Sequence, residues 1–243
     1  MSTLTRIPAA TIRNAEGRKA AAPGARVRSQ ASTLRINEIF FSLQGESSRV
    51  GLPTVFVRLT GCPLRCGYCD TAYAFHDGKT QLIDDVIAEA ALYPSKYICV
   101  TGGEPLAQKN CLALLTRLCD LGYSVSLETS GALDISAVDH RVSRIVDIKT
   151  PGSGEVDKNH WENLALLKGQ DEIKLVITSE ADYRWAVALL EDKKWHAMVP
   201  VLLSPAFNEV SYEQLAGWIL RDGLKVRMQV QLHKIIWGEQ RGV

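Results

Sequence analysis

Two kinds of segment alternate along this chain, and that alternation most constrains its fold. Segments rich in β-branched and aromatic residues cover residues 34–43, 53–60, 96–103, 123–131, 142–155, 171–178, 197–205 and 225–233. Segments with apolar residues at helical spacing cover residues 80–93, 106–122, 180–192 and 211–221. We expect Thr80 to be the N-cap of the first helix and Gly122 to end the second. Strands alternating with helices predict an α/β fold, with a parallel sheet joined by right-handed crossovers.

The length and charge of the chain narrow the class of protein. A length of 243 residues predicts one large domain in preference to two small ones. The 28 basic and 27 acidic residues balance, so no net charge points to nucleic acid or a membrane surface. No apolar run approaches the roughly 20 residues of a membrane span, and the N-terminus lacks the apolar core of a secretory signal. We therefore expect a cytoplasmic protein, whose six cysteines stay reduced.

Residues 1–33 differ in composition from the rest. They contain six basic residues, one acidic residue and no aromatic residue. Such a segment cannot bury much apolar surface, which predicts a disordered, solvated tail. The domain organisation expected is therefore a basic tail over 1–33 and a catalytic domain over 34–243.

Polar or glycine-rich residues follow six of the predicted strands. They form the stretch 60–71 and the motifs "TGGEP", "ETSG", "DIKTP", "LLSP" and "QLHK". In parallel α/β folds, ligands bind at the carboxyl ends of the strands. We expect these six segments to share one ligand site.

Three cysteines lie within the segment "TGCPLRCGYCDT", at Cys62, Cys66 and Cys69. A structural zinc site needs four ligands, usually as two separated pairs, and no second pair is present. His76 is a candidate fourth ligand, although this spacing is atypical for zinc. Three thiolates also suit a [4Fe–4S] cluster that leaves one iron open to the amine and carboxylate of an amino acid. The residues alone leave both metals possible.

The other three cysteines have a different setting. Cys99 lies within a predicted strand, and Cys111 and Cys119 lie on a predicted helix eight residues apart. We expect Cys111 and Cys119 to pack in the core.

The cysteine spacing, with Tyr68 before the third cysteine and "TGGEP" after a later strand, resembles the radical S-adenosylmethionine superfamily. The resemblance implies a partial TIM-like β/α barrel that holds a [4Fe–4S] cluster and S-adenosylmethionine. It places Tyr68 beside the adenine, and Gly103 and Glu104 beside the methionine amine. Glycine at such a position allows close backbone approach.

Within that superfamily, the chain resembles the 7-carboxy-7-deazaguanine synthases from about residue 34 to 233. The matching segments are "LQGE" over 43–46, Arg58 on the following strand, "CDT" over 69–71, "TGGEP", "ETSG", "DIKTPGSGE" and "QLHK". Ser47 departs from the family pattern, which has a second glycine after "QGE", and it restricts the backbone there.

This second resemblance implies a reaction. The substrate would be 6-carboxy-5,6,7,8-tetrahydropterin and the product 7-carboxy-7-deazaguanine, with ring contraction and loss of ammonia. The enzyme would be a carbon–nitrogen lyase of queuosine (7-deazapurine) biosynthesis, a pathway of transfer RNA modification, and would also need Mg²⁺.

The resemblance also implies roles for individual residues. The substrate would be bound by Leu43, Gln44, Gly45, Glu46, Arg58, Thr101 and His233. S-adenosylmethionine would be bound by Tyr68, Cys69, Asp70, Gly103, Glu104, Ser130, Lys149, Thr150, Pro151, Ser204, Pro205, Ala206 and Phe207. The cluster would be held by Cys62, Cys66 and Cys69, and Mg²⁺ by Thr71.

Physical chemistry supports several of these roles, and four of the residues have an alternative role as well. The planar fork of Arg58 matches a carboxylate, and the alternative is an arginine on a surface strand in an ordinary salt bridge. Lys149 could equally be the ion-pair partner of Asp147 or Glu128. Thr71 could cap a helix, and His233, placed at the end of the last strand, could be a solvated loop residue.

Two other functions remain open at this point. A glycyl-radical-enzyme activase shares the cysteine spacing and the cofactor, but it gives no reason for the "LQGE" segment with Arg58. A non-catalytic iron–sulfur or zinc protein would leave "TGGEP" without a role. The expected partners are the small pterin, an electron donor such as a flavodoxin and a second copy in a homodimer, with no direct contact to nucleic acid and none to a membrane.

Overall fold

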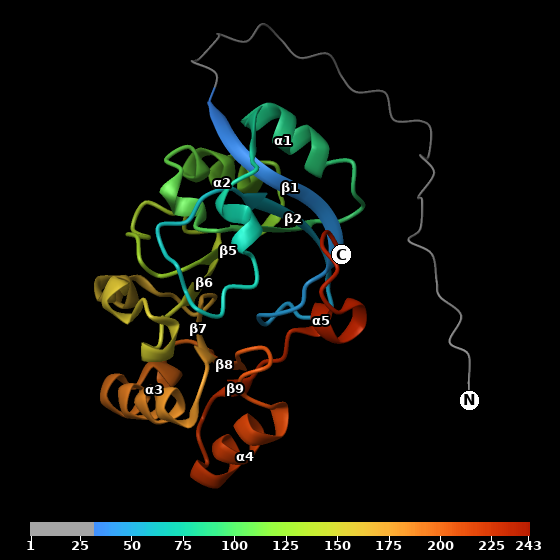
Figure 1. The fold of residues 1–243 in the computed structure, drawn as a ribbon. Coiled ribbons are helices and arrows are strands. Elements are labelled where there is room, and N and C mark those ends of the chain that lie inside the picture. The colour runs from blue at the N-terminus through green and yellow to red at the C-terminus, as the bar shows by residue number, and fades with distance from the viewer. Residues whose placement is uncertain (1–31) are drawn as a thin grey trace, which may run out of the picture. The chain divides into compact units, whose positions relative to one another are not determined.

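The computed structural model describes residues 32–243. Residues 1–31 of the predicted tail lie outside the described residues, and Thr33 already begins the first strand. The strands are β1 (Thr33–Leu43), β2 (Pro53–Leu59), β3 (Lys79–Leu82), β4 (Tyr97–Gly102), β5 (Ser124–Thr129), β6 (Ser143–Asp147), β7 (Glu172–Ile177), β8 (Val201–Pro205) and β9 (Arg227–Met228). The α-helices are α1 (Ile83–Ala90), α2 (Cys111–Asp120), α3 (Glu180–Lys193), α4 (Tyr212–Asp222) and α5 (Leu232–Trp237). Figure 1 shows the arrangement.

All the described strands form one sheet in the order β3-β1-β2-β4-β5-β6-β7-β8-β9. From β2 to β9 every neighbouring pair is parallel, which confirms the prediction for that part of the sheet. At the other end of the sheet, β1 pairs with both β2 and β3 in antiparallel orientation. Among the described residues β3 and β9 are the two edges and do not pair, so the barrel stays open.

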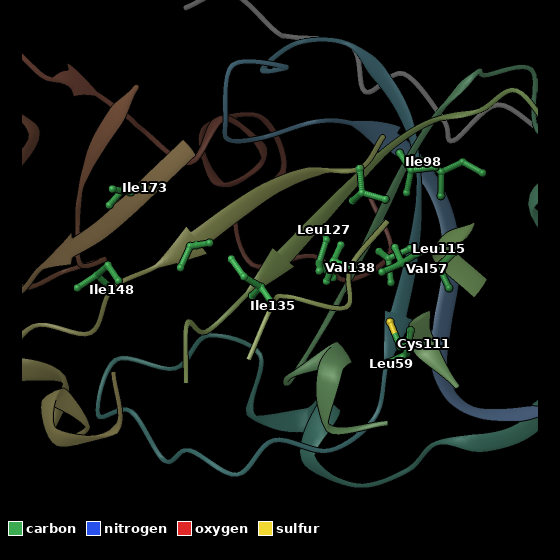
Figure 2. Packing of buried hydrophobic residues seen from close by; sticks show 14 of the residues in the cluster. Val57, Leu59, Ile98, Cys111, Leu115, Leu127, Ile135, Val138, Ile148 and Ile173 are labelled. Atoms are coloured by element: carbon green, nitrogen blue, oxygen red, sulfur yellow. The ribbon is translucent and has the colours of Figure 1, made fainter. Parts of the chain in front are cut away.

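The main core lies between the sheet and its helices. In β2, Val55, Val57 and Leu59 are fully buried on the helix side, because side chains alternate between the two faces of a strand. Figure 2 shows Val57 and Leu59 close to Cys111 and Leu115 of α2. Complete burial of one such aliphatic side chain contributes about 1.5–3 kcal/mol.

Helix α2 confirms two predictions. Its buried residues recur at helical spacing and include both Cys111 and Cys119. The helix ends at Asp120, and Gly122 follows with a φ of +85°, a left-handed conformation that glycine adopts without a Cβ clash. The helix begins only at Cys111, after a 3₁₀ turn over Pro105–Ala107, so the predicted start at residue 106 was too early.

Three short elements correct the sequence predictions. Thr80 does not cap a helix, because it lies in β3 and pairs with Arg35 of β1, while Leu82 occupies the N-cap position of α1. The strand predicted over 225–233 is reduced to the two residues of β9. The chain then turns into α5, which lies beside the end of β1 in Figure 1.

Strand β1 contains a β-bulge that decides which side chains face the helices. Ile36 pairs with Leu59, but Glu38 pairs with Arg58, so Asn37 is an extra residue. Before the bulge Leu34 and Ile36 join the main core, and after it Ile39 and Phe41 pack against that core. The bulge thereby turns Glu38 to the concave face of the sheet, where strict alternation would have placed it toward the helices.

Candidate active site

A cavity opens at the carboxyl ends of the parallel strands and continues along the concave face of the sheet. Residues from all six predicted strand exits line it. The predicted site residues that line it are Leu43, Gln44, Gly45, Glu46, Arg58, Cys62, Cys66, Tyr68, Cys69, Asp70, Thr71, Thr101, Gly103, Ser130, Lys149, Ser204, Pro205, Ala206, Phe207 and His233.

The three clustered cysteines lie on the loop after β2 and all face this cavity. Each is half-buried, and none forms a disulfide. The loop is held from below, because the Gly67 N–H donates to the Ser153 carbonyl at 3.1 Å and the Arg65 N–H donates to Glu155 at 2.5 Å. The "DIKTPGSGE" segment therefore supports the cysteine loop.

Burial raises the pKa of each of the three cysteine thiols, and the nearby ammonium of Lys149 acts in the opposite direction. Lys149 in turn pairs with Asp147 at 3.0 Å, which confirms the ion pair considered from the sequence. Burial disfavours its ammonium, but Asp147 and the neighbouring thiols keep the pKa of Lys149 above its ordinary value. The cavity thus places a permanent positive charge beside the cysteines.

The "TGGEP" turn packs directly on the cysteine loop. A Cβ on Gly103 would lie 2.3 Å from the Gly61 carbonyl and 2.7 Å from Cys62 Cβ, so only glycine fits there. The Glu104 N–H donates to the same Gly61 carbonyl at 2.8 Å. The turn therefore fixes the position of the cysteine loop relative to strand β4.

Glu104 does not line the cavity. Its fully buried carboxylate accepts hydrogen bonds from the N–H groups of Leu106 and Ser130 and from the hydroxyls of Thr129 and Ser130, at 2.5–3.0 Å. These contacts tie "TGGEP" to "ETSG" and occupy the carboxylate that the sequence placed beside the cofactor amine.

Thr150 and Pro151 also lie outside the lining. The Thr150 hydroxyl donates to Asp182 at 2.8 Å and to the Val176 carbonyl at 3.0 Å. Pro151 is exposed and starts a 3₁₀ turn. In this chain the two residues hold the turn after β6 in place.

The "LQGE" segment forms the cavity floor, at the far side from the cysteines. Antiparallel pairing brings the end of β1 to the start of β2, so the loop over 44–52 crosses beneath the concave face. Ser48 N–H donates to Glu172, and the Arg49 guanidinium donates to the Ser124 carbonyl at 3.0 Å. Ser47, the departure from the family pattern, adopts a φ of +66°, in the region that favours glycine.

Charged side chains that the sequence prediction missed lie between floor and rim. Lys174 on β7 pairs with Glu46, and the attraction raises the pKa of Lys174 despite its burial. Glu128 accepts from the Thr101 hydroxyl at 3.0 Å and from the Cys99 thiol at 3.5 Å. Lys174 sits on a strand that looked purely structural, where only its alternation with apolar core residues could have indicated it. Glu128 opens the "ETSG" segment, but no role of its own in the site was predicted for it.

Three buried polar atoms in the cavity have no hydrogen-bond partner among the described residues. They are Glu46 Oε1, Tyr68 OH and Asp147 Oδ1. Buried polar atoms are almost always paired in folded proteins. Their presence together in one cavity indicates a site that a polar ligand completes.

Helix α5 closes one side of the cavity. His233 lies on this helix and not at a strand end, because the last predicted strand is nearly absent. Lys234 Nζ lies 2.9 Å from Asp70 Oδ2, and Gln231 donates to the same oxygen at 3.1 Å. The Leu232 N–H donates to the Gly45 carbonyl at 3.0 Å, so α5 connects the floor to the cysteine loop.

Thr71 lies at the N-cap position of a 3₁₀ turn, Ala72–Phe75, but its side chain caps nothing. Its hydroxyl donates to Asp70 at 2.7 Å and lines the cavity. His76, the candidate zinc ligand, is not among the lining residues. No group of three or more His, Cys, Asp or Glu side chains between residues 32 and 243 is arranged to hold a single metal ion.

Comparison with known proteins agrees with this arrangement. The model of the radical SAM superfamily matches residues 56–150, which contain the cysteine loop and "TGGEP". A 7-carboxy-7-deazaguanine synthase of Chlorobaculum tepidum is 43% identical over 88% of this chain and 100% of its own length. One of Koribacter versatilis is 42% identical over 86% of this chain and 100% of its own length.

The chain belongs to the 7-carboxy-7-deazaguanine synthase family. The crystal structure of QueE from Escherichia coli has the same fold, with a TM-score of 0.68 and 24% identity over 83% of this chain and 95% of that one. The predicted partial TIM-like β/α barrel is thereby confirmed. The relatives do not favour the activase alternative.

Membership of this radical SAM family implies a [4Fe–4S] cluster and S-adenosylmethionine as cofactors. The residues present fit both groups. Three free cysteines on one loop offer the cluster its thiolates, and the unpartnered Tyr68 OH and Asp147 Oδ1 lie in the same cavity for a polar cofactor to complete.

No helix of the described chain is long and apolar enough to cross a membrane.

Proposed function

We propose that this chain converts 6-carboxy-5,6,7,8-tetrahydropterin to 7-carboxy-7-deazaguanine, with ring contraction and release of ammonia. One observation carries the proposal: the cysteine loop and a polar, charged floor built from the "LQGE" segment face each other across one cavity. The two relatives named above are called 7-carboxy-7-deazaguanine synthases, and this chain matches each of them over its whole length. The product would enter queuosine biosynthesis.

The cluster and the cofactor would bind at the rim. Cys62, Cys66 and Cys69 would hold the cluster. Residues from five strand exits would hold S-adenosylmethionine, and the lining members are Tyr68, Cys69, Asp70, Gly103, Ser130, Lys149, Ser204, Pro205, Ala206 and Phe207. When bound, cluster and cofactor together supply a one-electron route to removing a hydrogen atom from the substrate. Glu104, Thr150 and Pro151 would act by holding the turns that carry these residues.

The pterin would bind between the floor and the rim. Gln44, with backbone groups of Leu43 and Gly45, offers donors and acceptors to the amide edge of a pterin, and Glu46 Oε1 is a buried acceptor without a partner in the described part of the chain. Buried polar groups of this kind reject a ligand that cannot pair with them. Arg58, Thr101 and His233 would surround the carboxylate end, where the guanidinium offers a planar fork.

Magnesium would bind beside Thr71. Its hydroxyl oxygen is a hard ligand in the cavity, and Mg²⁺ completes its octahedron with waters and substrate oxygens. Lys234 would limit the affinity, since its ammonium already neutralises Asp70 next to Thr71.

The wider setting is also proposed. Residues 34–243 would form the catalytic domain of a cytoplasmic enzyme. A small reductant such as a flavodoxin would deliver the electron, and two copies would form a homodimer.

The test is an anaerobic assay. Protein reconstituted with iron and sulfide would receive dithionite, S-adenosylmethionine, Mg²⁺ and 6-carboxytetrahydropterin, and products would be followed by mass. We expect 7-carboxy-7-deazaguanine without stoichiometric loss of S-adenosylmethionine. Cleavage of the cofactor with the pterin untouched would refute the substrate while retaining the radical chemistry.

A further inference from the structure

The bulge at Asn37 creates a cross-strand pair that faces the concave side of the sheet. Glu38 of β1 and Arg58 of β2 are register partners, and Arg58 Nε donates to Glu38 Oε1 at 2.7 Å. If Asn37 instead took a regular place in the alternation, Glu38 would share the face of Ile36, which lies in the core. A strand irregularity is therefore used to set one carboxylate beside one guanidinium.

Tyr73 fixes the pair from the cysteine side. Its hydroxyl donates to the same Glu38 oxygen at 2.8 Å. Burial and the hydrogen bond to Glu38 raise the pKa of Tyr73 to about 12, against the opposing effect of Arg58, so the hydroxyl stays a donor at neutral pH. Tyr73 belongs to the 3₁₀ turn directly after the cysteine loop, so the pair is coupled to that loop.

Two aromatic rings lie close to the guanidinium. Arg58 Cζ lies 5.7 Å from the ring centre of Phe40 and 5.9 Å from that of Tyr73. Phe40 is itself stacked on Phe56 at 4.9 Å. A cation within about 6 Å of an aromatic ring centre is attracted by the ring, so both rings favour this place for the guanidinium.

The remaining edge of the guanidinium is left free for a ligand. Glu38 occupies Nε, while neither Nη atom donates to any group within residues 32–243. Neither Nη atom is among the sealed, unpartnered polar atoms, and Arg58 lines the cavity whereas Glu38 and Tyr73 do not. Two parallel N–H groups are thus presented together, as bidentate binding of a carboxylate requires.

We propose that Glu38, supported by Tyr73, is a positioning residue that holds Arg58 with its two-Nη edge toward the carboxylate of the substrate. The inference rests on the proposed function, because it needs a substrate with a carboxylate at this end of the cavity. It adds two residues that touch neither substrate nor cofactor.

A purely structural role for Glu38 gives a different expectation. If Glu38 only neutralised a buried cation, its loss would weaken binding of all pterins alike or lower stability alone. A positioning role predicts a selective effect. The affinity for a pterin with the 6-carboxylate falls, whereas that for a pterin without it is unchanged.

The experiment compares two ligands on reconstituted enzyme with S-adenosylmethionine and without reductant, so that no turnover occurs. Dissociation constants for 6-carboxytetrahydropterin and for tetrahydropterin are measured anaerobically by calorimetry, and their ratio gives the preference for the carboxylate. The variants are E38A, E38Q, Y73F and R58K. D120N is the matched control, because it removes a carboxylate from an arginine pair at the surface, far from the cavity lining.

We expect E38A to reduce the preference about tenfold or more, E38Q and Y73F about threefold, and R58K as strongly as E38A, while D120N leaves it unchanged. If E38A does not fold, E38Q and Y73F decide the question. An unchanged preference in folded Glu38 and Tyr73 variants overturns the inference and leaves the proposed function standing. A wild-type protein that shows no preference overturns both.

Discussion

Gly45 and His233 meet at the cavity floor so closely that a Cβ on Gly45 would lie 2.1 Å from His233 Nδ1. The Leu232 N–H donates to the Gly45 carbonyl beside this contact. The floor segment and helix α5 can therefore pack this closely only because residue 45 has no side chain.

The Gly45→Ala substitution should separate these two elements. The methyl group displaces His233 and α5, at a cost of about 1–3 kcal/mol in the free energy of unfolding, and the Michaelis constant for the pterin should rise at least tenfold. Urea unfolding and steady-state kinetics measure the two effects. The Gly217→Ala variant is the control: within residues 32–243, no atom outside the local helix backbone lies within 4 Å of its Cβ, and alanine in helix α4 should add up to about 1 kcal/mol to the free energy of unfolding. Equal behaviour of the two variants would contradict the contact.

The protonation of His233 should make stability depend on pH. Burial lowers the pKa of His233 below its ordinary value, so the neutral imidazole is the form that the fold favours. Its contribution is complete above about pH 6.5, the unfolded value, and is lost as the pH falls through the lower folded value. The wild type should therefore lose more stability between pH 8 and pH 5.5 than His233→Gln, by at most about 1.4 kcal/mol per pH unit. An equal loss of stability in the two proteins over this pH range, measured by urea unfolding, would disprove this.

Lys174 should be needed for folding as well as for the site. Replacing it by methionine leaves the Glu46 carboxylate buried without its partner, and breaking a buried pair costs about 3–5 kcal/mol; we expect about 3 because solvent enters the cavity. The Lys174→Met, Glu46→Gln double variant should recover part of that loss. Arg221→Met is the comparison, since its ion pairs are exposed and should contribute less than about 1 kcal/mol. If Lys174→Met loses no more free energy of unfolding than Arg221→Met, the buried carboxylate of Glu46 does not need Lys174 as its partner.

Ser47 carries backbone strain that glycine would relieve. A left-handed conformation costs a residue with a side chain about 1–2 kcal/mol, but glycine also gains freedom in the unfolded chain. The change further removes the Ser47 hydroxyl that accepts from the Arg49 N–H at 3.1 Å. We therefore expect Ser47→Gly to raise the free energy of unfolding by less than about 1 kcal/mol. Asn208→Gly should gain less at a similar φ of +63°, because asparagine tolerates this region. A loss of stability in Ser47→Gly would show that the hydroxyl matters more than the strain.

The long elements were predictable because each had a strong local pattern. Strand β2 alternates core residues with cavity residues and was found almost to the residue, while α2 repeats its apolar residues at helical spacing and was found with its start five residues too early. Residues 80–82, predicted as helix, and 229–233, predicted as strand, were assigned wrongly, because elements of two to six residues carry too little local pattern to outweigh tertiary contacts.

The site was predictable at its strand exits and less so on its inner wall. Tyr68, Lys149 and Arg58 stood in recognisable segments and do line the cavity. Lys174 was missed, and Glu128 was given no role of its own within "ETSG", because a single charged residue within an apolar strand does not reveal which face it occupies. Glu104 stood in a recognised motif, yet its carboxylate turned out to be held by protein donors.

The bulge at Asn37 has a consequence for how this protein tolerates change. Deleting that one residue would place Glu38 directly after Ile36, and ordinary alternation would then still turn Ile36 to the core and Glu38 to the concave face. The register pairs Ile36–Leu59 and Glu38–Arg58 would both survive, and only the bulge would be lost. A one-residue deletion beyond the bulge, between Ile39 and Leu43, has no extra residue to absorb it and would exchange the two faces of part of the strand. A one-codon deletion should therefore do less harm at Asn37 than at Phe40.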